Sequence, residues 1–201
     1  MIRKATLVVC TLVLALSAGF AAASTTPPPD TLKVDYFANA NTAGAPDGTV
    51  RLTNPGTIQS VSGTGGYNSA NICAAIYVFD PNQELSECCS CFLSPDGLRT
   101  LSVNVDLTGN PLTGVVLGTG LIKVVSTPTY KNVCPLPTSL YPTPAIRAWA
   151  THIQNSNFAI TETASQDATL SAAEVSRLQN ECYAIQLDGS KKGVCTCGTG
   201  D

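Results

Sequence analysis

The stretch from Asn71 to Leu107 constrains the fold most, because it combines three strand-like runs with four cysteines. Its first run, Cys73–Asp80, is apolar on both alternating faces, a pattern typical of a central strand that is covered on two sides. A second run, Glu84–Phe92, follows a Pro-Asn turn at Pro81-Asn82. The third run alternates after another turn, and its predicted inward residues are Leu101, Val103, Val105 and Leu107.

The first 23 residues have the pattern of a secretory signal peptide. Arg3 and Lys4 give a positive start, an apolar segment follows, and the small residues Ala21–Ala23 suit a signal peptidase. The apolar segment is shorter than the roughly 20 residues of a membrane span, and a retained anchor is therefore the weaker alternative. We expect cleavage after Ala23, no membrane span in the mature chain, and a secreted protein that is extracellular, at the cell surface or periplasmic.

Eight of the nine cysteines lie beyond the predicted cleavage site. An even number of cysteines behind an export signal indicates disulfides, whose connectivity the sequence leaves open. In a strand, Cys89 and Cys91 share a face and Cys88 takes the other, which favours crosslinks to two different neighbours over one tetrahedral metal site. All eight are predicted to form disulfides: Cys73, Cys88, Cys89, Cys91, Cys134, Cys182, Cys195 and Cys197.

The remaining chain alternates short strand-like runs with Gly- and Pro-rich turns, and one helix is predicted near residues 172–187. Ser171 and Glu174 form a capping box at its start, and Asp188-Gly189 ends it. A proline-rich lead at 24–30 precedes the fold. We therefore predict one domain over 31–201, an all-β, mainly antiparallel β-sandwich with one C-terminal α-helix, stapled by disulfides.

Charge and motifs narrow the partners. Only 12% of residues are charged, the formal net charge is −3, and no basic cluster occurs, so nucleic acid is not an expected partner. His152 is the only histidine, and no Gly-x-Ser-x-Gly motif accompanies it. We interpret His152 as an exposed or edge position of a strand, and we predict no catalytic residue.

Polar residues crowd the first turn and form a candidate ligand site. Alternating oxygen ligands there would suit Ca²⁺, although the glycine and terminal glutamate of an EF-hand loop are missing. The competing interpretation is a solvated turn, and no other cofactor is predicted. The four candidate residues are Asp80, Asn82, Glu84 and Glu87.

Four segments of the mature chain resemble a group of secreted, cysteine-rich bacterial proteins of unknown function. The segments are Cys73–Asp80, Glu87–Cys91, Asn110–Gly114 and Arg147–His152. The resemblance spans most of the mature chain and implies a bacterial exported protein. It implies no activity for any residue.

These observations favour a non-enzymatic extracellular module, structural or adhesive, such as a cell-surface or filament subunit with its own copies as partners. The proline-rich lead further predicts that Leu32–Tyr36 completes the sheet of a neighbouring subunit. Two alternatives stay open. One is an extracellular module that binds a glycan or calcium at the first turn, and the other is a secreted hydrolase.

Overall fold

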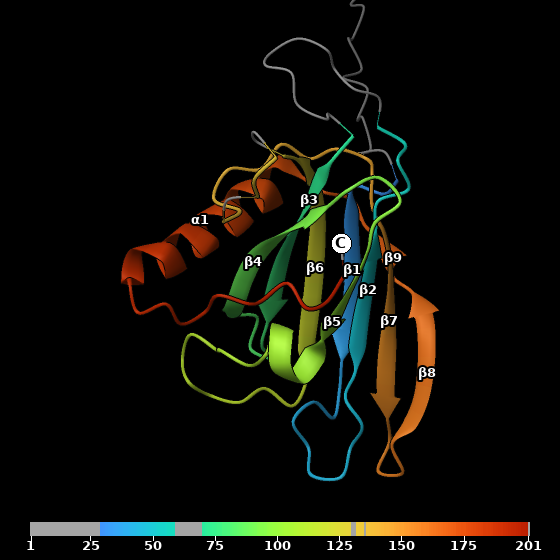
Figure 1. Ribbon diagram of the computed structural model, residues 1–201. Coiled ribbons are helices and arrows are strands. Elements are labelled where there is room, and N and C mark those ends of the chain that lie inside the picture. The colour runs from blue at the N-terminus through green and yellow to red at the C-terminus, as the bar shows by residue number, and fades with distance from the viewer. Residues whose placement is uncertain (1–28, 59–69, 130–131, 135, 201) are drawn as a thin grey trace, which may run out of the picture.

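The computed structural model describes residues 29–58, 70–129, 132–134 and 136–200, so the predicted signal peptide and most of the proline-rich lead lie outside the described residues. The strands form two antiparallel sheets, ordered β4-β3-β6-β1-β9 and β5-β2-β7-β8. Figure 1 shows α1 lying beside the first of these sheets. The predicted fold class, an antiparallel β-sandwich with one C-terminal helix, is confirmed. The elements are β1 (Leu32–Phe37), β2 (Thr49–Thr53), β3 (Ile72–Phe79), β4 (Leu85–Leu93), β5 (Leu98–Ser102), η1 (Val103–Leu107), β6 (Gly120–Pro128), β7 (Arg147–Gln154), β8 (Ala159–Ala164), β9 (Gln166–Asp167) and α1 (Ala172–Asp188).

Strand β3 is the central strand that the sequence predicts. It lies between β4 and β6 and is buried at every position. One face, with Ile76 and Val78, belongs to the core between the two sheets. The other face, with Tyr77 and Phe79, belongs to a second core beneath α1. The apolar residues on both faces therefore serve two separate cores.

The predicted third strand is wrong beyond Ser102. Residues Val103–Leu107 form η1, a π-helical turn, and Val105 is 71% exposed. The Ser102 hydroxyl accepts a hydrogen bond from the Val105 N–H (2.8 Å), and the Asp106 carboxylate accepts one from the Ser102 N–H (2.7 Å). These local bonds compete with a strand ladder, because they satisfy the backbone within the turn. Strand β5 also pairs with β2 in the second sheet, so the turn after β4 crosses between sheets.

Strand β1 fills a place in its own sheet. It pairs with β6 at six positions and with β9 at two. In this single chain Leu32–Tyr36 completes its own sheet, and exchange of the strand with a neighbouring subunit stays a prediction. Deleting this segment would remove an internal strand from the first sheet.

The helix begins and ends as predicted. Ser171 caps its start, since its hydroxyl accepts a hydrogen bond from the Glu174 N–H (3.1 Å), and Gly189 ends it in the left-handed conformation at φ 66°. The buried face of α1 packs on the first sheet through Leu178 and Ile185. The capping pattern and the apolar spacing therefore predict the helix correctly.

Glu174 joins the start of α1 to the first sheet through an ion pair with Lys123, and a substitution of Glu174 tests how much this ion pair contributes to stability. Its carboxylate accepts hydrogen bonds from Arg177 and from Lys123 of β6 (2.6 Å to Lys123), and these contacts, led by Arg177, lower its pKa to about 2. Because the pKa of Glu174 is lower in the folded state, its ionised carboxylate stabilises the folded protein at pH values above the ordinary pKa of 4.5. This stabilisation is lost as the pH falls toward 2. We expect Glu174→Gln to lower the free energy of unfolding by about 1–2 kcal/mol at neutral pH, after solvent screening, and by little near pH 2.

Urea unfolding at the two pH values measures this difference. Glu181→Gln is the matched control, because Glu181 also pairs with Arg177, whereas the sheet residue Lys123 pairs with Glu174. Equal destabilisation by the two variants would contradict the tie to the sheet.

The C-terminal tail closes one side of the sandwich. The N–H of Cys88 in β4 donates to the Gly193 carbonyl (2.8 Å), and Thr199 exchanges two hydrogen bonds with Thr100 of β5 (3.0 Å each). In Figure 1 the tail runs from the end of α1 across the front of the strands. Both outer strands on this side, β4 and β5, therefore carry the tail along their edges.

Four disulfides join the parts of the fold. Cys88 reaches α1, whereas Cys89 and Cys91 reach the tail, so the predicted crosslinks to two different neighbours are confirmed. Several disulfides indicate an oxidising extracellular or periplasmic environment. Within the described residues, no helix has the length and apolar character needed to cross a membrane. The pairs are Cys73–Cys134, Cys88–Cys182, Cys89–Cys195 and Cys91–Cys197.

Candidate functional site

The predicted ligand turn is held by its own hydrogen bonds. The Asp80 carboxylate accepts from the backbone N–H groups of Asn82 (2.9 Å) and Glu84 (2.8 Å) and from the Asn82 side chain (3.2 Å). Glu87 lies apart from this turn, because it is fully buried within β4. Among the described residues, no group of three His, Cys, Asp or Glu side chains gathers as a metal site. The four predicted residues therefore do not form one site.

Glu87 is instead a buried carboxyl in the core between the sheets. It pairs in register with Val78, which faces that core, and shares its face with Cys89 and Cys91. One oxygen accepts the Asn110 N–H (2.9 Å), and the other has no hydrogen-bond partner among the described residues. Burial raises the pKa of Glu87 to about 7, although the Asn110 bond opposes the shift. Its alternation with the two cysteines is a sequence signal that could have predicted this burial.

His152 is buried rather than exposed, which corrects the interpretation from sequence. It is 4% exposed, its ring stacks on Tyr36 at 4.3 Å, and its Nδ1 lies 3.1 Å from the Tyr36 carbonyl oxygen. Its Nε2 lies 2.9 Å from the Thr163 hydroxyl and 3.3 Å from the Asp35 carboxylate. A hydrolytic triad places the carboxylate and the nucleophile on opposite ring nitrogens, whereas here both lie at one. His152 therefore joins β1 of one sheet to β7 and β8 of the other.

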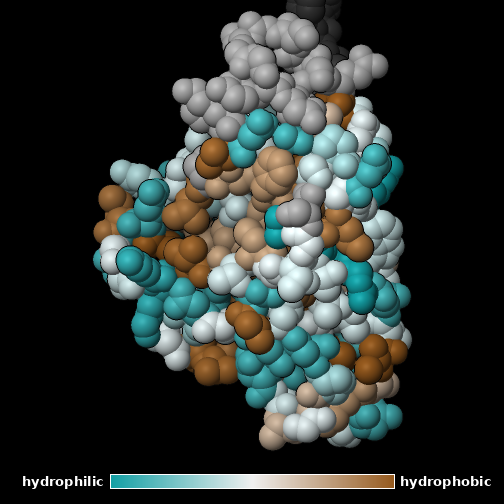
Figure 2. Space-filling model, in the orientation of Figure 1, coloured by the Kyte–Doolittle hydropathy of each residue, from teal (hydrophilic) through white to brown (hydrophobic). Residues whose placement is uncertain are grey.

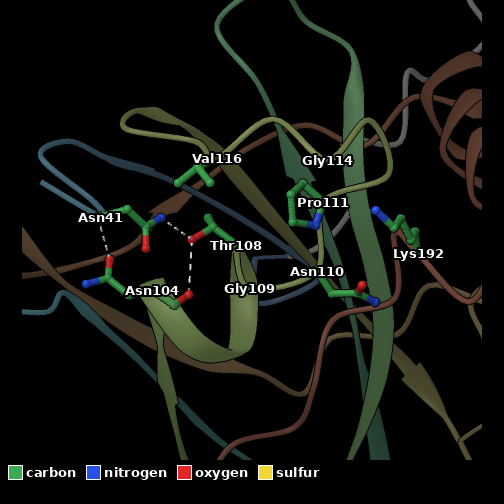
Figure 3. Close-up of a pocket in the computed structure, with 9 residues that line it drawn as sticks. All are labelled: Asn41, Asn104, Thr108, Gly109, Asn110, Pro111, Gly114, Val116 and Lys192. Carbon is green, nitrogen blue, oxygen red and sulfur yellow. Dashed lines mark hydrogen bonds between the residues drawn. The ribbon is translucent and has the colours of Figure 1, made fainter.

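A pocket of about 420 Å³ lies where two loops meet the C-terminal tail (Figure 3). The β1–β2 loop contributes one residue, η1 and the loop after it contribute most of the wall, and the tail contributes a lysine. We call it the amide pocket, because three asparagines line it. Its lining residues are Asn41, Asn104, Thr108, Gly109, Asn110, Pro111, Gly114, Val116 and Lys192.

One end of the amide pocket is fixed by hydrogen bonds between its own side chains. The Asn41 amide nitrogen donates to the Thr108 hydroxyl (2.9 Å) and to the Leu117 carbonyl (3.0 Å). The Asn104 side-chain oxygen accepts the Asn41 N–H (2.9 Å). A methyl group on Gly109 would lie 2.3 Å from the Val105 carbonyl oxygen, so the turn requires glycine there. The wall is therefore arranged before any ligand binds.

The other end is fixed to the tail. The Asn110 amide nitrogen donates to the carbonyls of Lys191 (2.8 Å) and Val194 (3.1 Å), and the Gly193 N–H donates to the Asn110 carbonyl (2.7 Å). These bonds set the position of Lys192, whose ammonium forms no ion pair within the described residues. The pocket thus combines neutral amides, one cation and the apolar surfaces of Pro111 and Val116.

Sequence reasoning missed the amide pocket. Its residues come from several separate segments, one of them the predicted third strand, and nothing local indicates that Asn41, Asn104 and Lys192 meet. The only available signal is the density of Asn, Thr and Gly in those segments. Comparison of the chain with protein-family models, with curated proteins and with solved structures gives no match. The resemblance to secreted bacterial proteins therefore stays a prediction.

Proposed function

We propose that the protein is a secreted, non-enzymatic adhesive module that holds a glycan in the amide pocket. The observation that carries this proposal is the pocket's lining of amide and hydroxyl groups beside an apolar wall. Its volume suits one or two sugar rings, since small-ligand pockets are typically about 300–1,000 Å³. Lys192 is the one ionisable side chain in the lining, whereas acid–base catalysis of glycoside cleavage uses a pair.

The chemistry of the lining suits sugars. The amide nitrogens of Asn41 and Asn110 each donate two hydrogen bonds within the protein, which leaves their side-chain oxygens to accept from sugar hydroxyls. The C–H face of a sugar ring packs on apolar surface, which Pro111 and Val116 supply. Lys192 would pair with the carboxylate of an acidic sugar. The frame is rigid because disulfides hold the tail, and rigidity lowers the entropic cost of binding.

Secretion is part of the proposal. The signal-peptide pattern at residues 1–23 supports it, and four disulfides are consistent with an oxidising compartment. Adhesion to a glycan surface then requires an exposed pocket, and the valine at its rim, Val116, is 65% exposed. The role as a cell-surface adhesive module follows from these two features together.

A pair of neighbouring valines offers a matched test. Val116 lines the pocket, whereas Val115 is similarly exposed (61%) but does not line it. We expect the oxidised mature protein to bind members of a glycan array, and Val116→Asp to weaken that binding at least roughly tenfold, through lost apolar contact and an added charge. Val115→Asp should bind as the wild type does.

Titration calorimetry with the best glycan from the array measures the affinities. Absence of binding to any glycan by the folded wild type would sink the proposal. Equal weakening by the two aspartates would move the binding surface away from the amide pocket to the exposed loop. Far-UV circular dichroism of each variant confirms that folding is unchanged.

A further inference from the structure

Of the four sheet edges formed by the described strands, three are closed or short. Strand β4 carries the tail along its edge through Gly193, and β5 carries Thr199. Strand β9 has two residues and its Asp167 accepts hydrogen bonds from Lys33 (2.8 Å) and the Asp30 N–H (3.0 Å). Strand β8 is the remaining edge, with six residues that are all exposed. It lies at the margin of the strands in Figure 1.

The alternation of hydrogen-bonded and non-hydrogen-bonded pairs between β7 and β8 shows which backbone groups of β8 point to the open edge. Ser165 donates its N–H to the Ala148 carbonyl (3.0 Å), one step beyond the β7–β8 register pair Trp149–Ala164. Because bonded and non-bonded pairs alternate in an antiparallel ladder, residues 159, 161 and 163 bond to β7. The N–H and C=O groups of Ile160, Glu162 and Ala164 therefore point to the open edge. Within the part of the chain that the structure describes, the Ala164 carbonyl alone among these groups accepts a hydrogen bond, a long one (3.4 Å) from the Gln166 side chain.

Strand β8 also lacks the features that usually protect an edge. It has no proline and no lysine, its register with β7 has no bulge, and Ile160, Thr161 and Thr163 favour a strand. Its single charge, Glu162, is paired with Arg51 of β2. An edge of this kind is a template for another extended strand. Figure 2 shows apolar residues at several separate places on this face, among them the region of α1.

We propose that β8 pairs antiparallel with β8 of a second copy of this chain, which joins two four-stranded sheets into one continuous sheet. We assign a second copy as the partner because β8 is self-complementary: its outward N–H and C=O groups can pair with the same groups of another β8. Among its described residues, a copy offers no other open edge of this length. Antiparallel pairing of one strand with itself is also compatible with twofold symmetry, the commonest arrangement of homodimers.

The outward groups fix the register of the pairing. When Glu162 faces Glu162 of the copy, Ile160 faces Ala164, and every outward N–H and C=O of both strands finds a partner. All of these residues share the outer face of the sheet, as their register with Trp149 and Thr151 requires. The two facing carboxylates are each paired with Arg51 of the same chain, which relieves their repulsion.

Proline at position 162 gives a sharp test. It removes an N–H that points to the open edge and leaves the β7–β8 ladder intact, because edge strands tolerate proline in that phase. Two intermolecular hydrogen bonds are lost per dimer, so we expect Glu162→Pro to raise the dimer dissociation constant roughly 30-fold. Ile160→Lys should weaken pairing as well, since a lysine on an edge opposes strand addition. Sedimentation velocity of the oxidised mature protein over a concentration series measures the constants.

The controls separate this proposal from the glycan proposal. Thr151→Lys places a charge on the same sheet face but on β7, and Val116→Asp alters the amide pocket, so both should dimerise as the wild type does. A wild type that stays monomeric, or a folded Glu162→Pro and Ile160→Lys that dimerise normally, would overturn the proposal. If Glu162→Pro does not fold, the dimer dissociation constant of Ile160→Lys alone tests the proposal. Glycan binding by a monomer would leave the function of the pocket intact.

Discussion

Replacing both tail disulfides with alanine pairs is expected to lower the free energy of unfolding by about 5 kcal/mol, whereas replacing either pair alone costs about 2 kcal/mol. The two bridges, Cys89–Cys195 and Cys91–Cys197, both join β4 to the tail. Their cysteines lie only two residues apart in β4 and two residues apart in the tail. With the Cys88–Cys182 bridge in place, the first of them closes a loop of roughly 15 residues, worth about 3 kcal/mol. The second closes only a ring of roughly six residues, worth about 2 kcal/mol.

The reason for the unequal costs is that one remaining bridge still holds the tail against the sandwich. Loss of both also frees the tail from the edges of β4 and β5 and opens the core that contains Cys195. Urea unfolding of the wild type, the two paired variants and the combined variant measures the coupling. Removing Cys73 with Cys134 is the control, because that bridge holds a different segment and its cost should add to that of either tail pair. A combined cost no larger than a single one would contradict the stapling role.

Glu87→Gln is expected to stabilise the protein by about 3 kcal/mol above pH 7 and by little below pH 4.5. The pKa of Glu87 rises from 4.5 to about 7 because burial disfavours its charged form. The folded protein therefore binds more protons than the unfolded chain between these values, and stability falls as the pH rises through this window. Glutamine keeps the oxygen that accepts the Asn110 N–H and carries no charge, so the variant should lose this slope.

Thermal unfolding at a series of pH values measures the effect as a difference between the two proteins. Glu84→Gln is the matched control, because Glu84 lies on the exposed turn at the start of the same strand and should keep the wild-type slope. Parallel pH profiles for the wild type and Glu87→Gln would show that the Glu87 carboxyl does not titrate in this window. The Glu174 effect does not interfere, since its window lies between about pH 2 and 4.5.

Local patterns predict most elements of this fold. The apolar residues on both faces of Cys73–Asp80 identify the central strand, since side-chain alternation in a strand follows from backbone geometry alone. Ser171 and Glu174 identify the start of the helix, because the hydrogen bond from the Glu174 N–H to the Ser171 hydroxyl spans only three residues. The alternation of Cys88 with Cys89 and Cys91 likewise predicts bridges on two faces. It also places Glu87 on the core face, although a charged residue beside a turn reads first as solvated.

Other features depend on residues that are distant in the chain. Asp47 accepts the Asn104 N–H and the Thr196 hydroxyl donates to Asp106, so segments distant in the chain help to hold the predicted third strand as η1. The turn before β5 carries the chain into the second sheet. His152 is buried because Tyr36 and Asp35 approach it from β1. Neither outcome has a signal in the periodicity of its own segment.

The sequence by itself determined the strand-rich class, the central strand, the helix and the cysteines available for crosslinking, because backbone geometry and short-range hydrogen bonds act over a few residues. Tertiary structure alone decided the disulfide partners, the burial of His152, the amide pocket and the open edge at β8. Each of these depends on contacts between segments far apart in the chain, such as the tail bridges with a sequence separation of 106. Such contacts form only when the two sheets, the helix and the tail pack together, and local propensity carries no information about which segments will meet.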